Sequence, residues 1–288
     1  MVDELRGALV ANRLLRFVYS VVKRAPGGKA LLQPVASWLV PRSRRLHARV
    51  GSGLAKNLVI LVDPRYSHEY IRGNLDPWLQ KLMSDSLQPG GVYVDVGAHI
   101  GFFVLCAARV VGKDGRIVAL EPDPDNFAGL SANIEINSLN QVVALKIAAW
   151  SSSTTLIFKR SSAASGLSEG RVIGEAVDGE PPDQLWQVDG VTLDRILTDP
   201  PGLVKIDVEG AEVDVLFGAE RLLSARQTVW VVECHTLGLA LTVERIFRSH
   251  EYAVDRLDPP DSAQRVWTQI YLIARPGNRW FRGEGSDR

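Results

Sequence analysis

Short apolar runs alternate with longer amphipathic stretches along residues 91–274 of this 288-residue chain. The amphipathic stretches repeat their apolar side chains at helical spacing, as Phe127, Leu130 and Ile134 do. The pattern predicts strands over residues 92–96, 116–120, 142–149, 203–208, 228–233, 252–257 and 266–274, and helices over 98–111, 124–137, 211–223 and 241–250. Such alternation indicates an α/β sheet that is mostly parallel. Because residues 258–265 are too few for a parallel crossover, we expect the last strand to run antiparallel.

Residues 151–190 interrupt this alternation, because they are rich in Ser, Gly, Asp and Pro. The pattern predicts strands at the two ends of this insertion, over 154–159 and 186–192. A long irregular insertion in a compact domain usually has a function or lacks order. Two interpretations stay open, namely a cover over a bound substrate and a loop with no chemical role.

The chain has no formal net charge, but its charges are unevenly distributed. Residues 1–50 hold ten Lys or Arg residues and two acidic residues, so this segment carries +8 and the remainder −8. Residues 9–24 predict a basic amphipathic helix, which either lies on an anionic membrane surface or packs on the domain with its basic face in water. We expect a basic N-terminal helical extension over residues 1–59, an α/β domain over 60–277 and a tail over 278–288.

The composition predicts a cytoplasmic protein. No apolar run approaches the ~20 residues of a membrane span, and no signal-peptide pattern is present. Cys106 and Cys234 each lie in an apolar run, as expected of buried thiols in a reducing compartment. Any contact with a membrane would then be peripheral, at the inner surface, through residues 9–49.

The first candidate site is the sequence VDVGAHIGFF (residues 94–103), where the first strand turns into its helix. Gly97 and Gly101 would let the backbone approach a ligand closely. Their spacing is not that of the dinucleotide fingerprint G-x-G-x-x-G, and Asp95 would repel a pyrophosphate. The turn therefore favours a cationic ligand over a phosphate.

The second candidate site is Glu121, at the end of the second strand. An acid at this position of an α/β sheet commonly accepts both hydroxyls of a ribose, although it would also suit the start of a helix. Asp95 and Glu121, at the ends of adjacent strands, together predict a nucleoside that carries a positive charge and no phosphate. S-Adenosylmethionine fits that description.

The third candidate site is acidic and lies at the ends of the fourth and fifth strands. Asp207, Glu209 and Glu212 lie in the sequence KIDVEGAE (residues 205–212), and such a cluster is costly unless it meets a cation, a hydrogen-bonding ligand or water. Glu233 and His235 are two residues apart, so they should point to the same side. A histidine with a pKa near ~6.5 suits a general base for a hydroxyl, and the alternative is a histidine that caps the strand end.

Taken together, these motifs resemble the FkbM family of methyltransferases, within the class I S-adenosylmethionine-dependent fold. The resemblance covers residues 60–275 and is carried by segments 73–77, 87–101, 119–122, 193–194, 205–212 and 233–235. It implies a Rossmann-like sheet of seven strands in the order 3-2-1-4-5-7-6, with the seventh antiparallel. It also implies O-methyl transfer, often to the hydroxyls of sugars or natural products.

The resemblance further implies which residues bind the cofactor. They comprise the turn after the first strand, the end of the second strand, the chain after the third strand and the end of the fourth strand: Asp95, Gly97, Ala98, His99, Gly101, Glu121, Pro122, Ala149 and Asp207. His99 stands where asparagine is frequent in the family.

Transfer to a hydroxyl requires removal of its proton as it attacks. The candidates for this step are His235, Asp207 and Glu209. Alternatively, Asp207 and Glu233 would hold a magnesium ion that lowers the pKa of the hydroxyl.

Three classes of function stay open at this point. The chain would be an O-methyltransferase acting on a sugar, glycan or glycolipid hydroxyl, an NAD-type oxidoreductase, or a non-catalytic binding module that works through its basic segment. Nucleic acid is not an expected partner, because no Asn-Pro-Pro-Tyr/Phe motif follows the fourth strand and the site is acidic. The sequence does not distinguish a monomer from a homodimer.

Overall fold

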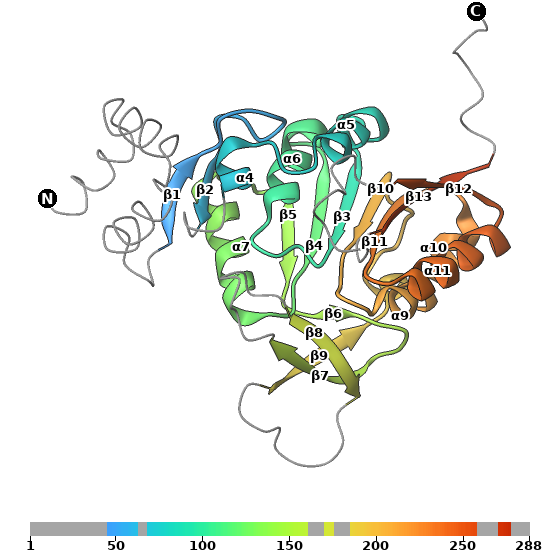
Figure 1. Ribbon diagram of the computed structural model, residues 1–288. Coiled ribbons are helices and arrows are strands. Elements are labelled where there is room, and N and C mark those ends of the chain that lie inside the picture. The colour runs from blue at the N-terminus through green and yellow to red at the C-terminus, as the bar shows by residue number, and fades with distance from the viewer. Residues whose placement is uncertain (1–44, 63–67, 161–169, 176–184, 258–269, 278–288) are drawn as a thin grey trace, which may run out of the picture. The chain divides into compact units, whose positions relative to one another are not determined.

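The computed structural model of the protein describes residues 45–62, 68–160, 170–175, 185–257 and 270–277 (Figure 1). The chain divides into two compact units, Met1–Arg45 and Leu46–Arg288. The basic helix predicted for residues 9–24 and the tail predicted for 278–288 lie outside the described residues. The elements below all belong to the second unit.

A central sheet of seven strands organises this unit (Figure 1). Its strands are, in spatial order, β12 (Tyr252–Leu257), β13 (Ile270–Pro276), β11 (Val229–Cys234), β10 (Leu203–Ile206), β3 (Val92–Val96), β4 (Arg116–Leu120) and β5 (Val142–Leu145). Strands β11, β10, β3, β4 and β5 are parallel, whereas β13 is antiparallel to both of its neighbours. This arrangement confirms the predicted mostly parallel α/β sheet with an antiparallel last strand in the order 3-2-1-4-5-7-6.

Alternate residues of each strand point to opposite faces of the sheet. Both faces carry apolar side chains, and helices cover both of them. Tyr93 and Ile117 belong to one apolar core with α5 (Pro77–Ser86), α6 (Phe102–Val111) and α7 (Pro124–Ile136), and α4 (His68–Arg72) packs against it. Val94 and Val118 belong to the second core, with α8 (Leu193–Ile196), α9 (Glu212–Phe217), α10 (Glu220–Ala225) and α11 (Leu237–Ser249). Burial of a large aliphatic side chain in such a core stabilises the fold by about 2 kcal/mol.

The insertion forms a sheet of its own, below the central sheet in Figure 1. Its strands are β6 (Ala148–Ala149), β9 (Leu185–Val191), β7 (Thr154–Arg160) and β8 (Gly170–Glu175). Leu156, Phe158 and Val188 form its small core. The two predicted end strands are confirmed as β7 and β9, but β8 was not predicted, and the predicted strand 142–149 divides between the two sheets.

The predicted helix over residues 211–223 is also divided. It ends at Phe217 and resumes at Glu220, on either side of Gly218. A Cβ atom on Gly218 would lie 2.0 Å from the carbonyl oxygen of Trp150. The chain therefore comes so close to the start of the small sheet that only glycine fits.

Residues 46–59 differ from the predicted helical extension. Strand β1 (Leu46–Arg49) pairs antiparallel with β2 (Val59–Val62), and Val50 and Ala55 between them are buried in the first core. Asn133 of α7 accepts a hydrogen bond from the Leu61 amide. The compact unit thus begins at Leu46, earlier than the predicted boundary at residue 60, because short apolar segments too brief for periodicity pack on α7.

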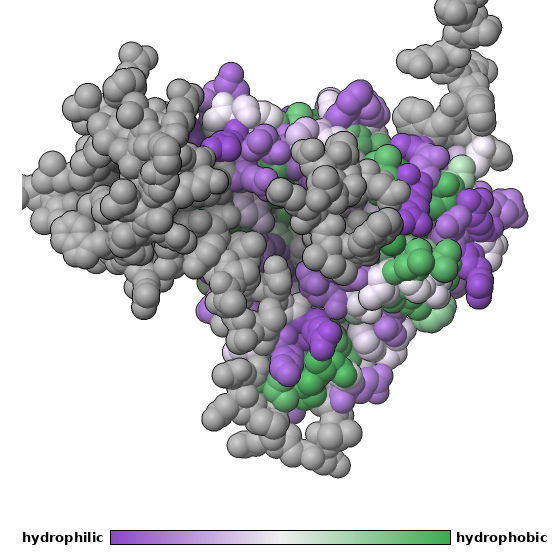
Figure 2. Space-filling view, in the orientation of Figure 1, coloured by the Kyte–Doolittle hydropathy of each residue, from purple (hydrophilic) through white to green (hydrophobic). Residues whose placement is uncertain are grey.

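The described residues on the face drawn in Figure 2 are mostly polar, with local apolar areas. Figure 2 shows green areas around α11 and over the small sheet. The exposed apolar side chains of these elements include Leu237, Leu241 and Ile173. In the described part of the chain, no helix has the length and apolarity needed to cross a membrane.

Candidate active site

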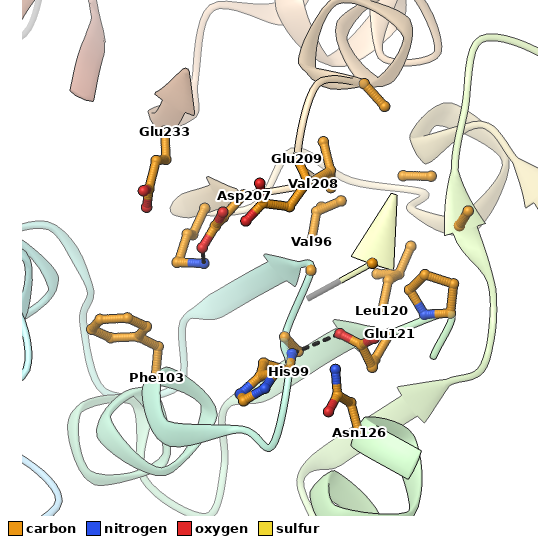
Figure 3. A pocket seen from close by; sticks show the side chains of 18 of the residues that line it. Val96, His99, Phe103, Leu120, Glu121, Asn126, Asp207, Val208, Glu209 and Glu233 are labelled. Atoms are coloured by element: carbon orange, nitrogen blue, oxygen red, sulfur yellow. Dashed lines mark hydrogen bonds and ion pairs between the residues drawn. The ribbon is translucent and has the colours of Figure 1, made fainter. Parts of the chain in front are cut away.

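A cavity of about 630 Å³ lies at the carboxyl ends of β3, β4 and β10 (Figure 3). Between β3 and β10 the order of the strands reverses, and this is where open α/β sheets bind their ligands. Residues from β3, β4, β10, β11, β13, α4 and the small sheet line it. In Figure 3, Glu121 lies at one end of the space, and Asp207 and Glu233 lie at the other. One continuous space therefore joins the predicted nucleoside site to the predicted acidic site.

The turn after β3 forms the floor of the first end. Gly97 has φ +80°, and a Cβ there would lie 1.8 Å from the carbonyl oxygen of Asp207. The amides of Gly97 and Ala98 both donate to the carbonyl oxygen of Leu120. Gly97, Ala98 and His99 all line the cavity. Their contact with a cofactor stays a prediction.

His99 contributes through its backbone. Its φ is +51°, and its amide donates a 2.7 Å hydrogen bond to Glu121 Oε2, drawn as a dashed line in Figure 3. Its ring stacks on Tyr70, with 6.3 Å between the ring centroids. His99 thus links the turn after β3 to the acid after β4.

Glu121 is almost fully buried and lines the cavity together with Pro122. Its Oε1 accepts a 2.9 Å hydrogen bond from the Asp123 amide, so each carboxylate oxygen has one backbone donor. A carboxylate has about four lone-pair sites, which leaves acceptor capacity toward the cavity. Burial raises the pKa of Glu121 to about 7, although the two amide donors lower it.

Part of the cavity wall is apolar. Ala148 and Ala149 of β6 line the cavity, which agrees with the position predicted for Ala149. Phe158 and Val172 line it from the small sheet. Sequence reasoning did not select these two residues: Phe158 lies in a predicted strand whose neighbours the sequence does not reveal, and no strand was predicted at Val172.

Asp95 lies behind the cavity wall, and its predicted contact with the cofactor stays a prediction. It is 1% exposed and is not among the residues that line the cavity. Lys205 is its register partner on β10, and its Nζ lies 3.6 Å from Asp95 Oδ1 and 3.2 Å from Asp207 Oδ2. Burial raises the pKa of Asp95 to about 6, while Lys205 lowers it. The cation beside Asp95 is therefore a lysine that the sequence reasoning did not consider, although a lysine in a buried strand is itself a signal.

Gly101 also lies behind the cavity wall. It precedes α6 with φ +86°, and a Cβ there would lie 2.5 Å from Leu130 Cδ1. The prediction that Gly101 contacts the cofactor is not supported by this position. Its backbone instead allows α6 to start close to α7.

The second end of the cavity is acidic. Asp207, Glu209 and Glu233 line it, and their side chains gather at one side of the cavity in Figure 3. Burial, followed by the charge of Asp207, raises the pKa of Glu233 to about 8. The sequence prediction that these strand ends form one acidic site is reflected in the geometry.

His235 lies behind these acids and does not line the cavity. Its Nε2 lies 3.2 Å from Glu209 Oε2 and 3.8 Å from Asp207 Oδ1, and its Nδ1 lies 3.0 Å from Oε1 of the buried Glu212. Burial alone would lower the pKa of His235, but the bonds to Glu209 and Glu212 raise it to about 11. A protonated imidazole has no lone pair for a proton, so this arrangement disfavours His235 as the general base.

The same group bears on the predicted metal site. Asp207, Glu233 and His235 each offer one ligand atom, and these atoms lie within 4.8 Å of one another. A histidine ligates a metal only in its neutral form. The residues fit a divalent cation through the oxygens of Asp207 and Glu233, while the charge on His235 opposes it.

The sheet order, the glycine turn after β3 and the acid after β4 define a Rossmann-like domain of the class I methyltransferase type. Residues 95–254, more than half of the chain, match the Methyltransferase FkbM domain. The chain belongs to this family of methyltransferases, as its motifs predicted.

Three similar proteins are informative. The chain is 29% identical over 193 residues to hexuronic acid methyltransferase AglP of Haloferax volcanii, which covers 65% of the chain and 73% of AglP. It is 38% identical over 55 residues to a protein-L-isoaspartate O-methyltransferase of Triticum aestivum, which covers 19% of the chain and 24% of that protein. The crystal structure of methyltransferase FkbM from Methylobacillus flagellatus aligns with a TM-score of 0.47 at 18% identity, over 76% of this chain and 56% of that one. The chain thus spans little more than half of the crystallised protein.

Proposed function

We propose that the protein is an S-adenosylmethionine-dependent O-methyltransferase whose acceptor is a sugar hydroxyl, free or in a glycan or glycolipid. The observation that carries this proposal is the single cavity with two different ends. One end offers Glu121 and an apolar wall, and the other offers Asp207, Glu209 and Glu233. The name of the H. volcanii relative supports a sugar acceptor. Family membership removes the support for an NAD-type oxidoreductase.

The residues at the first end suit the cofactor. Glu121 would accept hydrogen bonds from the ribose hydroxyls, and Ala149 and Phe158 would pack against the adenine. The glycine at position 97 leaves the turn after β3 without a side chain that would fill the space. When bound, the cofactor supplies a methyl group on a sulfonium, which a nucleophilic oxygen can attack in line.

The residues at the second end would hold and deprotonate the acceptor. Correct placement of the two reacting atoms supplies much of the acceleration in such a displacement. Asp207, Glu209 and Glu233 would accept hydrogen bonds from sugar hydroxyls. Among these carboxylates, Glu233 has a pKa of about 8, close to the pH at which a general base works well. Lys205 would keep Asp207 in place.

A divalent cation is the alternative means of activating the hydroxyl, with Asp207 and Glu233 as ligands. Assays with magnesium and with EDTA separate the two routes. Activity that survives EDTA supports the carboxylates alone, whereas loss that magnesium restores supports the cation.

Two measurements test the proposed function. Calorimetry with S-adenosylmethionine should show binding that Glu121→Ala weakens by at least about tenfold, because a hydrogen-bonded buried carboxylate is lost. Glu135→Ala, an exposed acid on α7, is the matched control and should bind normally. A screen for transfer of labelled methyl groups to sugars, glycolipids and small phenols should then identify a sugar acceptor. No cofactor binding at millimolar concentration would refute the proposal, and binding without transfer to any acceptor would favour a non-catalytic module.

A further inference from the structure

Asn126 is a buried polar side chain on the wall of the cavity, beside Glu121. It is 4% exposed and lines the cavity from the first turn of α7. Figure 3 shows its amide nitrogen pointing toward the Glu121 carboxylate, to which the His99 amide also donates. A buried amide needs a hydrogen-bond partner, and Glu121 provides one.

The start of α7 is built around Glu121. Asp123 is the N-cap of the helix, and its carboxylate accepts hydrogen bonds from the amides of Asp125 and Asn126. Asn126 is therefore the third helical residue, where a side chain commonly accepts a hydrogen bond from the amide of the N-cap residue. Here the Asp123 amide donates to Glu121 Oε1 instead, over 2.9 Å. Glu121 thus takes the place of the usual capping acceptor, and the side chain of Asn126 turns to Glu121.

Three donors of the described residues reach this one carboxylate. They are the His99 amide, the Asp123 amide and the side chain of Asn126. The first two are backbone groups, so Asn126 is the donor that depends on the type of residue at its position. An acidic residue at position 126 would place a like charge beside Glu121, whereas the neutral amide of asparagine donates a hydrogen bond to it.

From this arrangement we propose that Asn126 is a positioning residue for the cofactor, which holds the carboxylate of Glu121 at the place where it accepts the ribose hydroxyls. The inference rests on the proposed function and adds to it a residue that acts through Glu121. A carboxylate that is fixed before binding loses less conformational freedom when the ribose arrives. The contribution of Asn126 to cofactor affinity is therefore made through Glu121.

The same contact predicts a change in the pH dependence of cofactor binding. Burial raises the pKa of Glu121 to about 7, the hydrogen bonds from Asp123, His99 and Asn126 lower it, and the charge of Asp123 raises it. Removal of the Asn126 donor should therefore raise this pKa. Because only the carboxylate accepts hydrogen bonds from both ribose hydroxyls, the midpoint of the pH profile of affinity should move upward with it.

Calorimetry with S-adenosylmethionine from about pH 5.5 to about pH 9 tests the inference. In Asn126→Ala the midpoint should lie about one pH unit above that of the wild type, so affinity should fall about fivefold at pH 7 and less than about twofold at pH 9. Asn126→Asp, which has nearly the same shape, should move the midpoint at least as far, because it adds an acid. Asn137→Ala is the matched control, since it removes hydrogen bonds to Val59 at the other end of the same helix. It should lower stability without moving the midpoint.

A double-mutant cycle separates positioning from a direct or purely structural role. In a Glu121→Gln background, Asn126→Ala should change affinity by less than about twofold, because no carboxylate remains to be held. An equal loss in both backgrounds would overturn the inference, and so would an unmoved midpoint in both Asn126 variants or the failure of both to fold. If the wild type itself does not bind S-adenosylmethionine, the proposed function fails. Binding by the wild type that does not respond to Asn126 would refute the inference alone.

Discussion

At the end of β3, Asp95 lies on the same face of the sheet as Lys205 of β10, because the two residues share a register position. Lys205 then extends past Asp95 to Asp207, and Phe103 lies 5.5 Å from its ammonium group. Asp95 therefore serves to hold a buried cation in place, and that cation in turn holds Asp207. This pairing between neighbouring strands is not visible in the sequence motif alone.

At the same scale, the protonation of Glu121 should control cofactor affinity. Its pKa is about 7 in the folded protein, against an ordinary value of 4.5. Only the carboxylate form accepts hydrogen bonds from both ribose hydroxyls, so affinity should increase as pH rises through about 7. Between pH 8.5 and pH 5.5 the wild type should lose up to about 30-fold in affinity, while Glu121→Gln should bind weakly at both pH values. Calorimetry across this range is the measurement, and identical pH profiles for the two proteins would contradict the assignment.

The same shift has a consequence for stability. Because the folded state binds the proton more tightly than the unfolded chain, Glu121 stabilises the free protein most at low pH. This contribution is lost as pH rises from about 4.5 to about 7, and Glu121→Gln should flatten that part of the stability curve. Cofactor binding should therefore stabilise the wild type most above pH 7.

At the scale of elements, strand–helix alternation was sufficient to predict the central sheet. Strands β3 and β4 begin and end at the predicted residues, because each is a short apolar run between clear turns. Helix α6 starts at Phe102, later than predicted, because residues 97–101 form the turn after β3, in which Gly97, His99 and Gly101 have positive φ. The sequence could place the acids at strand ends, but not the direction of each side chain or the proton on His235, which depend on neighbours distant in sequence.

The small sheet shows most clearly what strand–helix alternation does not predict. Its strands pair across the insertion, and β6 joins it directly after the third strand of the central sheet. Such pairing depends on contacts between segments rather than on local periodicity. The interpretation of the insertion as a substrate cover stays a prediction, which the position of Phe158 and Val172 on the cavity wall supports.

Phe158 allows this element to be tested. It is 3% exposed and belongs to the core of the small sheet. Phe158→Ala should destabilise the sheet by about 3 kcal/mol and open the wall, which should weaken cofactor binding by about tenfold. Ile173→Ala is the matched control, since Ile173 lies on β8 of the same sheet but is 47% exposed. Hydrogen exchange of the small sheet and calorimetry provide the measurements. Unchanged cofactor affinity in Phe158→Ala would mean that the small sheet does not contribute to the site.

At the scale of the whole molecule, charge is unevenly distributed along the chain. Residues 1–50 carry +8, whereas the cavity at the sheet is acidic. A basic segment attracts anionic surfaces. A glycolipid, one of the proposed acceptors, would suit this feature. A cytoplasmic location, a peripheral contact of residues 9–49 with the inner membrane surface and a homodimer stay predictions.

The membrane contact is open to a direct test with the full-length chain. Each basic residue near an anionic surface contributes about 1 kcal/mol, so replacement of several should weaken binding by at least about tenfold. The variant replaces Arg13, Arg16, Lys23 and Arg24 with Gln, and cosedimentation is measured with phosphatidylserine-containing and with purely phosphatidylcholine vesicles. The wild type should bind the anionic vesicles alone and release them at high salt, and the variant should bind neither.

Because these residues lie outside the domain that carries the cavity, methylation of a free sugar should be equal in the two proteins, whereas methylation of a vesicle-bound glycolipid should fall in the variant. Equal vesicle binding by both proteins would show that the basic segment serves another purpose.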